Sequence, residues 1–406
     1  MVQFGVNENA LVQLPASISQ LYSLEIFDLR YNKLQTLPEE IGGLKSIKKL
    51  FLRYNRLEYL PNSICKLKTL ELLSIRNNNL VQLPENIHDL SELRVLDAHE
   101  NVLTRLPKLE GLWNLMDLNV HYNQLHKLPK TICYLSNLKK LHIGHNKFRS
   151  FPIEICQLAR LEVLDFESNM IESIPDQISN LTNLQQFYVS RNFIVHLPNS
   201  FSCLARLREF NADSNRMVDL PEGFSKLKEL KELNISSNNF SVFPDPAKLQ
   251  SVTSLDIHDN LISEIPASVY SLQLLKSLNI GENLISNLPI NICYLSSLTN
   301  LRLNCNRLSD LPENMEQLTS LRVLHLDDNL FTQLPSQISQ LTNLLSLSAL
   351  DNQLEDLPNE ITNLQNLKHL KLDGNPLSSL PRGLAGGGEI FQFITARASG
   401  LTSAPI

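Results

Sequence analysis

The sequence predicts an α/β solenoid with the form of a horseshoe, in which short parallel strands line a concave sheet and irregular or helical segments form the convex side. Asparagine recurs along the chain every 23 residues, with two intervals of 22. Apolar residues surround it in the pattern L-x-x-L-x-L-x-x-N-x-L-x-x-L-P-x-x-I-x-x-L, which has neither the roughly 3.6-residue period of a helix nor the alternation of an ordinary strand. A fixed period of this length indicates stacked repeats. The repeated asparagines are Asn9, Asn32, Asn55, Asn78, Asn101, Asn123, Asn146, Asn169, Asn192, Asn215, Asn238, Asn260, Asn283, Asn306, Asn329, Asn352 and Asn375.

The repeat is a leucine-rich repeat, and each part of it predicts an element. The L-x-L core predicts a strand, and stacking places successive strands about 4.8 Å apart in a parallel sheet with the leucines pointing inward. The asparagine turns the chain out of the strand, and its amide can bond backbone groups that would otherwise be buried without partners. The proline fixes φ where the chain starts back along the convex side.

The repeats divide the chain into a solenoid and a C-terminal cap. We expect the solenoid, 17 repeats of 22 or 23 residues, to occupy residues 1–382, and a cap helix with its tail to occupy residues 383–406. A repeat cannot bury its apolar side alone, so the end of the array needs a cover. Ile390, Phe391 and Ile394 have the spacing of a short amphipathic helix that could provide it.

Composition limits the classes of function. A net charge of −6 and a pI near 6.0 argue against nucleic-acid binding, which usually needs a basic surface. The sequence has no run of apolar residues long enough for a transmembrane helix. Four of the six cysteines follow the isoleucine of the repeat, where we expect small buried side chains, and no CxxC pair occurs. This usage favours a reducing compartment, so we expect a cytoplasmic protein that partners could recruit to the plasma membrane or the nucleus.

Motifs for catalysis and for cofactor binding are missing from the sequence. It has no phosphate-cradling glycine loop and no G-x-S-x-G motif. We therefore predict a protein that is not an enzyme and that needs no cofactor. His99, His121, His142 and His145 lie on neighbouring repeats, but an extended sheet should present them in a row. Zinc needs ligands that converge, so we expect no metal site.

Arginine and aromatic residues gather at the outward positions of the first repeats. Arginine occupies one column in three successive strands, with tyrosine and phenylalanine beside it, and histidine continues the column. Like charges so close are unfavourable unless an anionic group faces them, and this composition is typical of protein interfaces. We predict a docking surface for an acidic protein; the alternative is a solvated face with chance charges. The predicted partner-binding residues are Arg30, Tyr31, Phe51, Arg53, Tyr54, Arg76, His99, His121 and Tyr122.

Farther along the chain, acidic residues occupy the same outward-facing positions of the repeats. A change from basic to acidic along one sheet suits two different partners or one polarised partner. Acidic columns also keep an exposed sheet soluble, so both interpretations stay open. The acidic positions are Asp165, Glu167, Asp213, Asp256, Asp259, Asp327, Asp328 and Asp351.

Three features resemble a known family. The runs "FDLRYNKL", "LFLRYNRL" and "LSIRNNNL", the irregular "FSVFPDPAKLQSVTSLDIHDN" and the ending "NPLSSLPRGLAGGGEIFQF" are similar to the Ras-group repeat proteins, and in particular to the Shoc-two (Sur-eight) family of Ras–Raf scaffolds. The resemblance implies a concave face that holds a GTP-loaded Ras protein with the catalytic subunit of protein phosphatase one and regulates Raf and MAP kinase signalling. It would make Arg30, Arg53 and Arg76 the residues that meet Ras.

Two alternatives to that family remain open. Polarity or adhesion adaptors of the Scribble type carry similar repeats and bind unrelated partners. A Ras-sensing repeat domain of a larger enzyme, such as fungal adenylyl cyclase, would differ only in what is attached to it.

Overall fold

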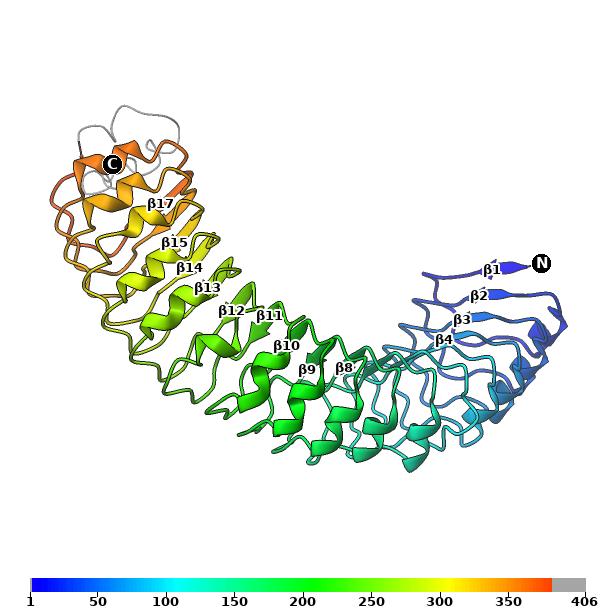
Figure 1. Cartoon of the computed structure of the whole chain (residues 1–406). Coiled ribbons are helices and arrows are strands. Elements are labelled where there is room, and N and C mark those ends of the chain that lie inside the picture. The colour runs from blue at the N-terminus through cyan, green and yellow to red at the C-terminus, as the bar shows by residue number, and fades with distance from the viewer. Residues whose placement is uncertain (1, 382–406) are drawn as a thin grey trace, which may run out of the picture. The chain divides into compact units, whose positions relative to one another are not determined.

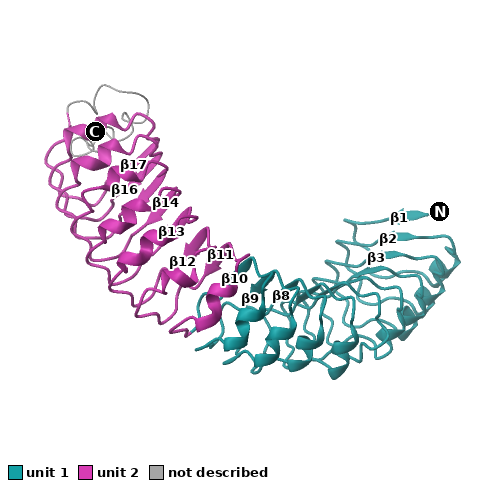
Figure 2. Ribbon diagram, viewed as in Figure 1, with its two compact units in different colours: residues 1–215 teal, residues 216–406 magenta. Residues whose placement is uncertain are grey.

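The computed structural model describes residues 2–381, in two compact units that comprise residues 1–215 and 216–406 (Figure 2). Each unit has the same two layers, a parallel sheet and a layer of short 3-10 helices. In unit 1 the strands lie on the inner side of the curve and the 3-10 helices on the outer side (Figure 2). The cap helix expected within residues 383–406 lies outside the described residues.

Short parallel strands stack in chain order within each unit (Figure 1). The middle residue of β2 to β17 is an apolar side chain buried in the interior, and neighbouring strands pair without any shift of register, as in Phe27↔Leu50 and Leu50↔Leu73. Unit 1 contains β1 (Gln3–Gly5), β2 (Ile26–Asp28), β3 (Lys49–Phe51), β4 (Leu72–Ser74), β5 (Val95–Asp97), β6 (Asp117–Asn119), β7 (Lys140–His142), β8 (Val163–Asp165), β9 (Gln186–Tyr188) and β10 (Glu209–Asn211). Unit 2 contains β11 (Glu232–Asn234), β12 (Ser254–Asp256), β13 (Ser277–Asn279), β14 (Asn300–Arg302), β15 (Val323–His325), β16 (Ser346–Ser348) and β17 (His369–Lys371).

The second layer consists of 3-10 helices, most of which begin directly after the repeat proline. Pro61, for example, precedes its helix with φ −65° and ψ 146°, so the ring holds the extended conformation from which the turn starts. The helices are η1 (Ala16–Gln20), η2 (Glu39–Gly43), η3 (Asn62–Lys66), η4 (Ile87–Asp89), η5 (Lys130–Tyr134), η6 (Ile153–Gln157), η7 (Asp176–Asn180), η8 (Asn199–Cys203), η9 (Glu222–Lys226), η10 (Pro246–Lys248), η11 (Ala267–Ser271), η12 (Ile290–Tyr294), η13 (Met315–Gln317), η14 (Ser336–Gln340) and η15 (Asn359–Asn363). This arrangement confirms the predicted leucine-rich repeat solenoid.

The repeated asparagines form the expected ladder of buried side chains. Asn146 is typical, because its amide nitrogen donates to the carbonyls of Val120, Ile143 and Gly144 at 2.9–3.1 Å. Its side-chain oxygen accepts the backbone N–H of Leu125 at 2.9 Å. One amide therefore serves backbone groups of two successive repeats, and the described equivalents from Asn32 to Asn352 are likewise buried.

Replacing Asn146 with alanine should lower the free energy of unfolding by about 1–3 kcal/mol, because buried backbone groups lose their partners. Chemical denaturation of the purified chain measures the effect. The control is Asn79→Ala, because Asn79 is exposed and directly follows a ladder residue. That variant should stay within about 0.5 kcal/mol of the parent. Equal stabilities for the two variants would contradict the ladder.

The residue before each asparagine has a left-handed backbone. At 16 non-glycine positions, from Glu8 to Asp351, φ lies between 48° and 57°, and Gly374 continues the series at 75°. This conformation turns the chain away from the strand, and its side chains include three tyrosines, Tyr31, Tyr54 and Tyr122. The strained position therefore recurs beside the outward face in every described repeat.

Three of the four cysteines at the repeat position are buried, as predicted. These are Cys65, Cys156 and Cys293, and burial raises the pKa of each thiol to about 11. Cys133, at the equivalent position, is only partly buried. All the cysteines are free thiols.

Candidate protein-binding surface

Six of the predicted binding residues lie in or just after β2, β3 and β4 in unit 1, and we call them the arginine–aromatic surface. The rings of Tyr31 and Tyr54 stack with centroids 4.4 Å apart and planes 7° from parallel. The guanidinium of Arg76 lies 5.3 Å from the centroid of the Tyr54 ring, and that of Arg30 lies 5.5 Å from the Phe51 ring. Aromatic rings thus contact two of the three arginines, which favours cation–π attraction. The surface consists of Arg30, Tyr31, Phe51, Arg53, Tyr54 and Arg76.

Arg30 has an acidic partner within the chain, which was not predicted from the sequence. Both carboxylate oxygens of Asp28 accept hydrogen bonds from its guanidinium, Oδ1 from Nε at 2.7 Å and Oδ2 from Nη2 at 2.5 Å. Burial of Asp28 acts to raise the pKa of its carboxyl, but hydrogen bonds from Arg30 and the charges of Arg30 and Arg53 outweigh it, so the pKa is lowered. Asp28 thus largely neutralises the charge of Arg30 before any partner binds.

Arg53 and Arg76 keep unused hydrogen-bonding capacity. The Nε–H groups of both are buried and have no hydrogen-bond partner among the described residues. Arg76 donates from Nη2 to the Tyr54 hydroxyl at 2.9 Å, whereas Arg53 has no ion-pair partner in the described part of the chain. Buried donors without partners are rare and call for an explanation. An acceptor supplied by a bound protein would provide one.

His99, His121 and Tyr122, the remaining predicted residues, lie farther along the same sheet. The rings of His99 and His121 are 6.4 Å apart, as expected for neighbouring strands. Nε2 of His99 lies 3.6 Å from a Glu100 carboxylate oxygen. Tyr122 stacks on His145 at 3.9 Å. This part of the face therefore mixes histidines with acids and differs in charge from the arginine–aromatic surface.

The histidines do not lie in a simple row, which differs from the expectation. His121 and His145 approach each other to 4.9 Å between ring centroids, and Glu167 lies beside both. Burial lowers the pKa of His121, although Asp165 acts in the opposite direction. The sequence showed Glu167 only as one residue of an acidic column. Its position beside the two histidines depends on side-chain conformations, which cannot be read from the spacing of the repeats.

Acidic outward residues in unit 2 bond to neutral or histidine neighbours. Asp256 Oδ1 lies 2.7 Å from Nδ1 of His258, and Asp327 Oδ1 accepts the backbone N–H of Leu350 at 2.8 Å. These contacts explain how the side chains are held but identify no partner.

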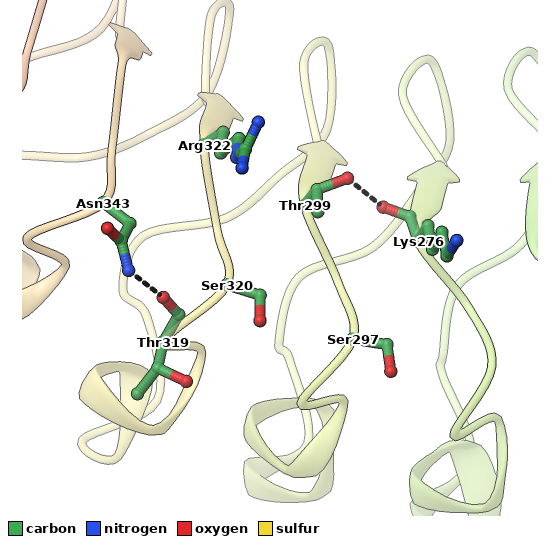
Figure 3. Close-up of a pocket in the computed structure, with 7 residues that line it drawn as sticks. All are labelled: Lys276, Ser297, Thr299, Thr319, Ser320, Arg322 and Asn343. Carbon is green, nitrogen blue, oxygen red and sulfur yellow. Dashed lines mark hydrogen bonds between the residues drawn. The ribbon is translucent and has the colours of Figure 1, made fainter.

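A shallow hollow in unit 2 lies on the segments that lead into β13 to β16 and has a volume of about 640 Å³ (Figure 3). The Thr299 hydroxyl donates to the Lys276 carbonyl at 2.9 Å, and the Asn343 amide donates to the Thr319 carbonyl at 2.8 Å. These two side chains thus bond the backbone of the preceding repeat. The lining residues of the hollow are Lys276, Ser297, Thr299, Thr319, Ser320, Arg322 and Asn343.

Comparisons with known proteins identify the repeat. Profiles described as leucine rich repeat match residues 3–57, 113–171, 159–217 and 229–249. The comparison with curated proteins gave no match. Within the described residues, no helix has the length and apolar character to cross a membrane.

Solved structures match over most of the chain. A leucine-rich repeat protein of Leptospira interrogans is 35% identical, with 92% of this chain and 90% of that one covered and a TM-score of 0.78. The plant peptide hormone receptor RGFR1, solved in complex with RGF2, is 26% identical over 89% of this chain and 69% of its own, with a TM-score of 0.68. YopM from Yersinia enterocolitica is 25% identical over 94% of this chain and 89% of its own, with a TM-score of 0.60. Leucine-rich repeat domains generally act as protein-interaction modules, and this chain belongs to the leucine-rich repeat family.

Proposed function

We propose that this chain is a non-enzymatic scaffold that binds a Ras-type small GTPase in its active, GTP-bound state through the arginine–aromatic surface. The observation that carries the proposal is the pair of buried, unpartnered Nε–H groups of Arg53 and Arg76. A carboxylate can accept two parallel hydrogen bonds from one guanidinium, and such charge-assisted bonds are stronger than neutral ones. Rotation of the two side chains would bring these donors to an acidic protein surface, which would supply the acceptors that the chain lacks.

The stacked rings support binding because they limit the motion of the surface before a partner arrives. Tyr54 contacts Tyr31 on one side and Arg76 on the other. Side chains that are already ordered lose less conformational entropy when a complex forms. Tyrosine and arginine are also among the residues enriched where interface binding energy concentrates.

The resemblance to the Shoc-two family supports the choice of partner. Arginine stands in one outward column of three successive repeats, as in that family, and Ras effector surfaces are acidic. The same resemblance supports protein phosphatase one as a second partner and the regulation of Raf and MAP kinase signalling as the result. The free cysteines fit a protein of the reducing cytoplasm, where such complexes act. Partners could recruit it from there to the plasma membrane or the nucleus.

Titration calorimetry tests the proposal with the purified chain and Ras-family proteins loaded with a GTP analogue or with GDP. We expect binding of the GTP-analogue form alone, with an affinity that falls as salt rises, because salt screens partly exposed ion pairs. Adding the phosphatase catalytic subunit should strengthen the complex. Absence of binding with every Ras protein would overturn the proposal and direct the search to partners of polarity-type adaptors.

A further inference from the structure

His121, His145 and Glu167 converge on one point of the sheet in unit 1, and we call them the histidine–glutamate triad. One potential ligand atom from each residue lies within 4.8 Å of the others. Oε1 of Glu167 is 2.9 Å from Nε2 of His145 and 3.7 Å from Nε2 of His121. Zinc bonds of about 2.0–2.2 Å would place neighbouring tetrahedral ligand atoms about 3.3–3.6 Å apart. The two observed separations lie on either side of that range, so small side-chain rotations would complete the geometry.

His121 has a free position at the centre of the triad. Its Nε2 atom is buried, yet it has no hydrogen-bond partner among the described residues. Leaving such an atom without a partner is costly, and native structures rarely do so without a functional reason. A metal ion between His121 and Glu167 would provide the missing partner.

Gly144 makes room for the ring of His121. A Cβ atom at residue 144 would lie 2.6 Å from Nε2 of His121 and 2.9 Å from Oδ1 of Asp165, closer than Cβ atoms approach such groups. In every other repeat of unit 1 this column carries a side chain, as in Arg76 and Glu167. The missing side chain thus lets the imidazole lie against the backbone of the next repeat and face Glu167.

Neighbouring groups hold the three side chains in place. The Ser190 hydroxyl donates to Oε2 of Glu167 at 3.2 Å, which leaves Oε1 directed at the histidines. A carboxylate oxygen of Asp165 lies 3.7 Å from Nδ1 of His121, on the ring edge away from the triad, where it attracts the ring by its charge without a hydrogen bond. Tyr122 stacks on His145 with ring planes 9° apart. Carboxylates behind metal-binding histidines and hydrogen bonds to liganding carboxylates are the usual supports of metal sites.

We propose that His121, His145 and Glu167 form a binding site for a divalent transition metal, with zinc as the best match. Two imidazoles and a carboxylate are a ligand set that zinc accepts with a fourth position left open, whereas calcium and magnesium prefer sites made of oxygen alone. The triad lies on the outward face of the sheet, so the open position is available to water or to a side chain of a bound protein. The site is separate from the arginine–aromatic surface and does not depend on the proposed GTPase partner.

The test uses the full chain stripped of metal with a chelator and titrated with zinc chloride in competition with a zinc-sensitive dye. We expect one equivalent to bind, and cobalt(II) to give the visible absorption of a tetrahedral site without the near-ultraviolet band of a thiolate ligand. Zinc should also raise the unfolding midpoint, since it binds the native state. The variants H145A and E167Q should each weaken zinc binding at least about tenfold, and G144A should weaken it without removing a ligand.

The matched control is His126→Ala, because His126 is exposed and lies outside the triad. It should bind zinc as the parent does, and circular dichroism should show that every variant is folded. Unchanged zinc affinity in both H145A and E167Q, or a cobalt spectrum with thiolate character, would assign the metal to other groups and overturn the proposal.

Discussion

Phe187→Ala should lower the free energy of unfolding by about 3–5 kcal/mol, the usual cost of removing a fully buried aromatic side chain. Phe187 is the middle residue of β9, and no part of it is exposed. Its ring centroid lies 5.8 Å from that of Phe210 and 6.2 Å from that of Phe201. Alanine would leave a cavity between repeats, and the contacts between neighbouring repeats are the main source of stability in a solenoid.

Phe187→Leu is the matched control for this prediction. Leucine already occupies the equivalent position of the preceding strand, where Leu164 pairs in register with Phe187. The change should therefore cost less than about 1.5 kcal/mol. Denaturant unfolding followed by circular dichroism measures both variants. If the alanine variant unfolded at the same denaturant concentration as the leucine variant, the phenylalanine cluster would not stabilise this part of the solenoid.

Arg53→Glu should weaken binding of a GTP-loaded Ras protein by more than about 30-fold, since reversing a charge at a desolvated contact costs about 2–5 kcal/mol. The substitution removes a buried donor that has no partner within the chain and places a second carboxylate near Asp28. Calorimetry at two salt concentrations measures the loss. The unfolding midpoint should change little, because the Nε–H of Arg53 has no partner to lose, and the backbone carbonyl of residue 53, which accepts the N–H of Tyr31, is kept.

Arg56→Glu separates a local contact from a general effect of charge. Arg56 belongs to the same repeat and is exposed, just beyond the asparagine. The substitution Arg56→Glu changes the net charge by the same amount as Arg53→Glu. It should therefore weaken long-range attraction equally while leaving the arginine–aromatic surface intact. Equal loss of affinity in the two variants would show that the contact at Arg53 is not specific. A folding defect confined to Arg53→Glu would show that the residue is structural.

The repeat pattern predicted the fold closely, because each position that recurs in the pattern has a local physical cause. The spacing of Asn146 and its equivalents located the ladder, and Pro61 and its equivalents marked where the chain starts back along the convex side, which is where most of the 3-10 helices begin. The neighbourhood of Tyr31, Tyr54 and the arginines could also be predicted, since parallel strands in register place equivalent residues side by side.

The pairings within the outward face could not be predicted from spacing. Asp28 is the last residue of β2 and stands two residues before Arg30, but only the side-chain conformations show that they form an ion pair. His121 was expected to lie in line with its neighbours, and its contact with Glu167 follows from the space that Gly144 leaves. Periodicity determines which residues face outward, whereas rotamers decide which of them meet.

The left-handed residue before each asparagine restricts how this face can evolve or be redesigned. Side chains branched at Cβ are strongly disfavoured at positive φ, and none of the 16 non-glycine residues in the series is valine, isoleucine or threonine. The column instead uses unbranched side chains such as tyrosine, serine, aspartate and glutamate. A new binding specificity at Tyr31 or Tyr54 must therefore use side chains that are not branched at Cβ, such as the aromatic, acidic, basic and small polar residues already found in the series.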